Sequence, residues 1–371
     1  MLYLDYTATT PIDEEVLETY IRIQKEFYAN INSLHQLGQN SKYLFEKIHQ
    51  EIKDLLGINH NLVFTGSAAE ANNYAILGYV RKYPQGNIIT TNIEHPSVYD
   101  VFLQLKQEGY DVRMLVVNQE GKIDLKQLEA FLDNNTLFLS IMWVNNIIGS
   151  IQQINEVLKM IKRYPRIKLH VDGVQGLCKI PNDFAFNDVD ILTFSAHKIF
   201  GPKGIGLLAI KNNIELKNIM YGSLSQYNIR PGTISLASVA AFYKAIKKGY
   251  NLFQEHYNDV KEKKEYLQKR ITQIPGIIIN SPADASPYIF NISFPGINGE
   301  TIVNYLSKEG IFVSTGSACS NKLRKPERTV LNITKSKELA TSSIRISLSY
   351  KTEYDDLEKL IETLNKVKQY V

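Results

Sequence analysis

A lysine and an aspartate each follow a strand-like segment of this chain. Lys198 lies in the run 195–204, directly after the apolar stretch 189–194, and Asp172 ends the earlier apolar segment 168–172. A lysine amine can hold an aldehyde as a Schiff base, and a carboxylate can keep a pyridine nitrogen protonated so that the ring accepts electrons from a substrate. The pair therefore predicts a site for pyridoxal phosphate (PLP), in which Lys198 holds the cofactor and Asp172 supports its ring.

The segments around this pair predict an α/β fold. From residue 62 to residue 210, short apolar strands alternate with helical periodicity, which is typical of a large, mostly parallel, doubly wound sheet. After residue 232 the pattern changes to one long helix, about 236–269, followed by shorter strands and helices, which indicates a smaller α+β unit. We therefore expect a large PLP-binding domain at residues 12–250 and a small domain formed by residues 1–11 and 251–371.

Composition excludes several classes of protein. The 371 residues are 44% hydrophobic and 22% charged, as in ordinary globular proteins, and the net charge of +4 is too small to predict direct nucleic-acid binding. Two cysteines in unrelated contexts predict neither a disulfide framework nor a metal site, and they favour the reducing cytoplasm. The start of the chain has no signal-peptide pattern, and the longest apolar run, 137–144, is too short to span a membrane. The mixed charges at 261–265 predict a solvated helix face.

Several longer strings carry a resemblance to a known family. They are LDYTATTP at 4–11, EANN at 70–73, EHP at 94–96, NNIIG at 145–149, the lysine run at 195–204, TGSACS at 315–320 and SIRISL at 343–348. In these strings, and in their order from residue 2 to about 355, the chain resembles the NifS/IscS cysteine desulfurases, in class V of the PLP-dependent aminotransferase superfamily. The resemblance implies the fold-type I architecture and a homodimer with the cofactor near the subunit interface.

The resemblance also implies which residues hold the cofactor. His95 would stack on the pyridine ring and shuttle protons, which suits a flat imidazole that titrates near neutrality. Gln175 would donate a hydrogen bond to the phenolic oxygen, and Asn146 would lie beside the ring. The remaining predicted contacts go to the phosphate: Ser195, His197, the helix start at Ala68 and Ala69, and Thr233 from the neighbouring subunit.

Two further residues are predicted to handle the substrate. Arg345 stands among strand-like apolar residues, and its guanidinium fork suits an α-carboxylate, which the resemblance assigns to it with help from Asn146. Cys319 lies in a run of glycine and serine, with three cationic residues at 322–325 that favour the reactive thiolate. The resemblance implies that this thiolate attacks the substrate sulfur and keeps it as a persulfide. Cys178, in an apolar string, is expected only to pack.

These residues predict a cysteine desulfurase, which converts L-cysteine to L-alanine and passes the sulfur to an acceptor protein. An iron–sulfur scaffold or a tRNA-thiolating enzyme would suit the basic stretch after Cys319. Three alternatives stay open at this point: a selenocysteine lyase on the same scaffold, a transaminase, and a degenerate, PLP-poor protein that only relays sulfur or docks partners. Cys319 argues against the transaminase, because transamination needs no such thiol.

The chain departs from the family pattern at three places. Ala69 stands where a phosphate-binding threonine is usual, and Ile147 stands where glutamate usually follows the asparagine. The glycine-rich string usual before Arg230 is replaced at residues 222–227. A lost hydrogen bond to a charged group costs about 1.5–3 kcal/mol, which Ser67 or water could offset. The catalytic set is intact, so these changes indicate a divergent paralogue with altered cofactor affinity.

Overall fold

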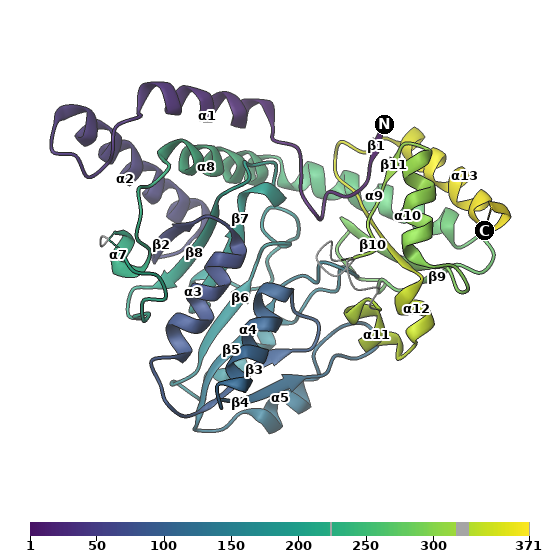
Figure 1. Ribbon diagram of the computed structural model, residues 1–371, viewed down its shortest axis with the longest axis horizontal. Helices are drawn as coiled ribbons and strands as arrows, with labels where there is room; N and C mark the ends of the chain where they lie inside the picture. Colours follow the sequence, from purple (N-terminus) through teal and green to yellow (C-terminus); the bar gives the residue numbers. More distant parts are fainter. Residues whose placement is uncertain (223–224, 317–325, 371) are drawn as a thin grey trace.

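A seven-stranded sheet is the largest element of the protein (Figure 1). A computed structural model describes residues 1–222, 225–316 and 326–370. The strand order is β2-β8-β7-β6-β5-β3-β4, parallel from β7 through β6, β5 and β3 to β4, whereas β8 pairs antiparallel with β7 and β2. The strands are β2 (His60–Thr65), β3 (Asn87–Thr91), β4 (Asp111–Leu115), β5 (Thr136–Met142), β6 (Lys168–Asp172), β7 (Ile191–Ser195) and β8 (Gly206–Lys211). The expected mostly parallel α/β sheet is confirmed.

Both faces of this sheet are covered, as continuous apolar strands require. Successive residues of a strand point to opposite faces, so Leu207 and Ala209 join one apolar cluster while Leu208 and Ile210 join the other. Helices α3 (Ala68–Val80) and α4 (Pro96–Gln107) cover one face, and α8 (Leu236–Asn251) covers the other together with α1 (Glu14–Glu26) and α2 (Gln36–Leu56). The shorter helices α5 (Leu125–Phe131), α6 (Ile154–Ile161) and α7 (Gln226–Ile229) complete this part of the chain.

Two smaller sheets lie beside the large one, near both chain termini (Figure 1). One has the order β12-β10-β9, and in the other β1 pairs parallel with β11, so the start of the chain lies beside residues 311–312. Their strands are β1 (Leu2–Tyr3), β9 (Ile278–Ile279), β10 (Ile289–Ser293), β11 (Ile311–Phe312) and β12 (Ser343–Ser347). The helices here are α9 (Phe253–Ile271), α10 (Gly299–Lys308), α11 (Arg328–Thr334), α12 (Lys337–Thr341) and α13 (Tyr354–Tyr370). The domain boundaries at residues 11 and 250 stay a prediction.

Two expectations about the region after residue 232 are wrong. The long helix is two helices, because the chain leaves helical geometry at Leu252, between α8 and α9. The charged segment 261–265 is not simply solvated: Lys263 and Lys264 are both buried, one paired with Asp259 at 2.7 Å and the other donating to the carbonyl of Ala285 at 2.9 Å. Long lysine side chains pack their methylene groups while the amine finds an acceptor, which a charge pattern does not show.

Within the described residues, no helix is long and apolar enough to cross a membrane. Across the same residues, histidine, cysteine, aspartate and glutamate side chains form no group of three or more that could hold a metal ion.

Gly206 permits a close approach of β8 to the start of α3. A Cβ at this position would lie 2.5 Å from the carbonyl carbon of Ser67 and 2.7 Å from the amide nitrogen of Ala68. Gly206→Ala should therefore push the helix start away and lower the free energy of unfolding by about 1–3 kcal/mol, as overpacking does. Denaturant unfolding of the two proteins measures this, and equal free energies would show that the strand and the helix separate without cost.

Candidate active site

A cavity of about 990 Å³, open to solvent, lies at the carboxyl ends of β6 and β7. This is the edge of a parallel sheet where ligands bind in open α/β folds. The structure brings ten of the twelve predicted site residues to its walls: Ala68, Ala69, His95, Asn146, Asp172, Gln175, Ser195, His197, Lys198 and Arg345. Thr233 is exposed and away from these walls, and Cys319 lies outside the described residues. The individual roles of all twelve stay predictions.

Lys198 lies at the end of the short 3-10 helix Ala196–Lys198, which continues directly from β7. Its Nζ donates to the backbone carbonyls of Thr7 at 2.7 Å and Ala8 at 2.6 Å, so the N-terminal segment crosses over the lysine. Burial, followed by the nearby charge of Arg345, lowers the pKa of Lys198 to about 8. A larger fraction of this amine is therefore unprotonated at neutral pH than for an exposed lysine, as proton abstraction or imine formation requires.

Asp172 ends β6 and is buried. One carboxylate oxygen accepts from the backbone N–H of Val174 at 3.1 Å, and the other from Nδ2 of Asn72 at 2.9 Å. Asn72 also donates to Oγ of Ser97 at 2.9 Å. The sequence reasoning used Asn72 only as part of a family string and missed its contact with the aspartate. Its signal is a polar residue on a helix face that otherwise carries buried residues such as Ala71 and Ala75.

His95 caps the N-terminus of α4. Its Nδ1 accepts from the backbone N–H of Ser97 at 3.1 Å and lies 2.8 Å from the Ser97 hydroxyl. A backbone N–H can only donate, so in the neutral ring Nδ1 carries the lone pair and Nε2 carries the proton. Burial lowers the pKa of His95, although the charge of Asp172 opposes this effect. The neutral ring can therefore stack on a cofactor and donate a hydrogen bond from Nε2–H.

The opposite wall offers several hydrogen-bond donors to an anion. The N–H groups of Ala68 and Ala69 lie in the first turn of α3, so no carbonyl within the helix accepts from them. Such free N–H groups at a helix N-terminus favour phosphate. The Ser195 hydroxyl is buried and finds no hydrogen-bond partner in the part of the chain that the structure describes. His197 lies beside it, with burial lowering its pKa to about 4, and its Nδ1 is 3.1 Å from Oγ1 of Thr9.

Arg345 reaches the cavity from β12, in the small sheet. Its Nη2 donates to Oδ1 of Asp5 at 2.8 Å and its Nη1 donates to the carbonyl of Asn146 at 2.9 Å. The sequence reasoning assigned Arg345 to the substrate carboxylate alone and missed its ion pair with Asp5. Nε of Arg345 is buried without a partner among the described residues. The guanidinium therefore keeps donor capacity for a carboxylate, while Asp5 fixes its orientation.

These residues fit PLP. The cavity combines an amine of lowered pKa for the aldehyde, a buried carboxylate for the pyridine nitrogen and a flat imidazole for the ring. The unpartnered hydroxyl of Ser195 and the free end of α3 lie where a phosphate would satisfy them.

Ala69→Thr should tighten PLP binding, because it places a hydroxyl beside the free N–H groups of α3. The Ser67 hydroxyl already accepts from the backbone N–H of Glu70 at 3.1 Å, so this oxygen is partly used in capping the helix. We expect a gain on the order of 1–2 kcal/mol, or about tenfold in affinity. Equilibrium dialysis against PLP measures it, and unchanged or weaker retention would show that the site has adapted to alanine.

The comparisons with known proteins agree with this geometry. Residues 2–360 match the family model described as aminotransferase class-V. A NifS/IscS-type homologue from Lactobacillus delbrueckii subsp. bulgaricus is 36% identical over 100% of this chain and 98% of its own length. A protein of Clostridium botulinum named cysteine desulfurase IscS is 34% identical over 99% of this chain and 94% of its own. A solved NifS-like protein superposes with a TM-score of 0.93 at 28% identity, over 100% of both chains.

The family model covers nearly the whole sequence, and the relatives exceed 30% identity along its full length. Both findings agree with the lysine, aspartate and arginine that line one cavity. The chain therefore belongs to the NifS/IscS cysteine desulfurases of the PLP-dependent class-V aminotransferase family.

Proposed function

We propose that this protein converts L-cysteine to L-alanine and holds the released sulfur as a persulfide on Cys319. The observation that carries the proposal is the placement of Lys198, Asp172 and Arg345 around one cavity, which supplies an amine, a carboxylate and a fork for the substrate carboxylate. The C. botulinum relative is named a cysteine desulfurase, which supports cysteine as the substrate.

Each residue of the cavity has a task that follows from its surroundings. PLP, when bound, supplies an electron-accepting ring that weakens the bonds at the substrate Cα. Arg345, oriented by Asp5, would bind the α-carboxylate, and Asp172, held by Asn72 and Val174, would accept a hydrogen bond from the pyridine nitrogen.

Lys198 is better placed than His95 to remove the Cα proton. Its pKa of about 8 leaves a usable fraction of free amine near neutrality, whereas Nδ1 of His95 is occupied by the N–H of Ser97. His95 would instead stack on the ring and donate a hydrogen bond from its Nε2–H.

The sulfur step needs a thiol, and the described residues that line the cavity do not include a cysteine. In our proposal the Cys319 thiolate forms an S–S bond with the substrate sulfur while the Cβ–S bond breaks and its electron pair stays with the carbon skeleton. The skeleton leaves as alanine after it gains one proton at Cβ and regains at Cα the proton that was removed. Cationic residues at positions 322, 324 and 325 would favour the thiolate.

The partners follow from the same chemistry. A persulfide must be passed on, so we propose a protein acceptor, either an iron–sulfur scaffold or an enzyme that thiolates tRNA, and a cytoplasmic location. Thr233 is exposed at a distance from the cavity, which supports its contribution to the site of a neighbouring subunit in a homodimer.

The two alternative functions require different residues in the cavity. A PLP-poor relay protein has no use for a lysine of lowered pKa facing a buried aspartate, so the intact cavity supports the enzyme. A selenocysteine lyase would share every residue described, and the turnover of L-cysteine against L-selenocysteine separates the two.

Lys198→Ala should abolish covalent attachment of PLP. The purified wild type should be yellow, with visible absorption that responds to L-cysteine, and the variant should lose this band on dialysis while its unfolding transition is kept, because the amine that binds the aldehyde is gone. A dialysed variant that keeps the same absorption would show that another lysine holds the cofactor.

Cys319→Ser should separate cofactor chemistry from sulfur transfer. Serine has nearly the size of cysteine, but its hydroxyl is a far poorer nucleophile at neutral pH than a thiolate. The variant should bind PLP and change its visible spectrum with L-cysteine, yet produce less than about 1% of the wild-type alanine and persulfide.

Cys178→Ser is the matched control for this variant. Cys178 is half-buried and lines a different cavity, its pKa is raised by burial, and its Sγ lies 3.7 Å from the carbonyl of Ile246. The control should therefore keep turnover and lose only stability, because it buries a hydroxyl. Near-normal alanine production by the Cys319 variant, or its loss in a folded Cys178 variant, would contradict the mechanism.

A further inference from the structure

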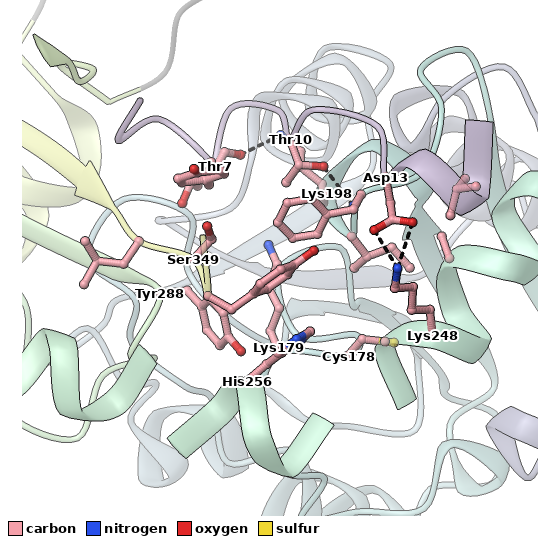
Figure 2. A pocket seen from close by; sticks show the side chains of 18 residues that line it. Thr7, Thr10, Asp13, Cys178, Lys179, Lys198, Lys248, His256, Tyr288 and Ser349 are labelled. Carbon is pink, nitrogen blue, oxygen red and sulfur yellow. Dashed lines mark hydrogen bonds and ion pairs between the residues drawn. The ribbon is translucent and has the colours of Figure 1, made fainter. Parts of the chain in front are cut away.

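A second cavity, of about 620 Å³ including its opening to solvent, lies on the other side of Lys198 (Figure 2). The two cavities share Thr7 and Lys198 in their walls. Gln175 lines the active-site cavity, whereas Lys179, four residues later in the turn after β6, lines the second one. A contact between these two side chains therefore connects the second cavity with the active site.

Lys179 carries a buried amine that the proposed mechanism does not use. The residue is 8% exposed, and its Nζ donates to Oε1 of Gln175 at 3.0 Å. Among the described residues, the cations Lys198 and Arg345 and the Cys178 thiol act on this amine, and Lys179 in turn acts on the imidazole of His197. Burial, followed by the charge of Lys198, lowers the pKa of Lys179 to about 7. An amine in such surroundings needs a specific acceptor, and the side chain of Gln175 provides it.

Both polar atoms of the Gln175 side-chain amide have a hydrogen-bond partner. Its Nε2 donates to the carbonyl of Thr7 at 3.1 Å, while Oε1 faces Lys179. The carbonyl of Thr7 can only accept, so Nε2 must be the atom that faces it, and Oε1 then faces the Lys179 amine, which has N–H groups to donate in either protonation state. In this orientation Nε2 has a second N–H that remains available to a group in the active-site cavity.

We propose that Lys179 is a positioning residue, which fixes the amide of Gln175 so that its nitrogen can donate to the phenolic oxygen of bound PLP. The proposal rests on the proposed function, because it requires PLP in the first cavity. Lys179 itself touches neither cofactor nor substrate. Without it, Oε1 would lose its charged donor, and the amide could turn its oxygen towards the phenolic oxygen, where two acceptors would face each other.

A donor to the phenolic oxygen should be visible in the titration of the bound cofactor. It stabilises negative charge on that oxygen, and so it lowers the pH at which the Lys198–cofactor linkage loses its proton. We expect the spectrophotometric midpoint of the Lys179→Met holoenzyme to rise by about one pH unit above that of the wild type. An unchanged midpoint in the folded, PLP-loaded variant would overturn the proposal.

Removal of a nearby cation could raise the midpoint directly, so a double-mutant cycle is needed. The cycle adds Gln175→Leu and the variant that carries both changes. If Lys179 acts through Gln175, Lys179→Met should shift the midpoint by less than about 0.3 pH unit in the Gln175→Leu background. An undiminished shift in that background would show a direct effect of charge and would overturn the positioning role.

Lys179→Arg is the rescue variant, because it keeps a charged donor and its side chain can extend into the second cavity. Its midpoint should lie near the wild-type value, and a midpoint equal to that of Lys179→Met would also contradict the proposal. Should Lys179→Met fail to fold, the cycle is run with Lys179→Leu, which also removes the donor, on the same criteria. If the wild-type protein shows no visible absorption that responds to L-cysteine, the proposed function is overturned instead. Failure of the positioning role and failure of the proposed function are therefore distinguishable.

Discussion

The N-terminal segment 5–10 supplies the acceptors that allow several cations to be buried around one site. The carbonyls of Thr7 and Ala8 accept from Lys198, the carbonyl of Thr7 also accepts from Gln175, and the carboxylate of Asp5 pairs with Arg345. A buried charge without such partners would cost several kcal/mol or would lose its proton. The lysine and the arginine can face one cavity only because this segment crosses it.

The same segment joins the two parts of the structure that form the site. On one side, Asp5 forms a bridge with Ser347, and the backbone N–H of Thr7 donates to the Ser347 hydroxyl at 3.1 Å. On the other side, the N–H of Thr10 donates to the carbonyl of His197 at 2.9 Å. The relative position of β12, which carries Arg345, and the turn that carries Lys198 is therefore set by hydrogen bonds from six consecutive residues. Loss of these contacts would separate the substrate fork from the cofactor lysine.

The parts of this arrangement that depend on local pattern could be predicted from the sequence. Asp172 and Lys198 follow strongly apolar strands, and carboxyl ends of neighbouring parallel strands meet at one edge, so their shared cavity followed from periodicity. The placement of Arg345 beside them came from a family string, since nothing local ties β12 to β6. The break at Leu252 was missed because both flanking segments have the same helical pattern.

The contacts that could not be predicted use backbone acceptors or pairs distant in sequence. The carbonyl of Thr7 has no side-chain signature, and 340 positions separate Asp5 from Arg345. Lys179 was overlooked because a lysine in a turn is usually solvated, whereas here the turn after β6 directs it back beneath the site.

The two buried lysines differ in pKa because their surroundings differ. Lys198 faces Asp172 and Asp5, whose charges raise its pKa against the larger effect of burial, so that it stays near 8. Among the described residues, the charges of Lys198 and Arg345 lower the pKa of Lys179 beyond the larger effect of burial, and no carboxylate is among the causes of this shift, so the pKa falls to about 7. The charge of Lys198 lowers the proton affinity of Lys179, and the carbonyl of Thr7 accepts both from Lys198 and from Gln175, which is the acceptor of Lys179. A change at Lys198 should therefore be felt at Lys179, although of the two lysines only Lys198 lines the active-site cavity.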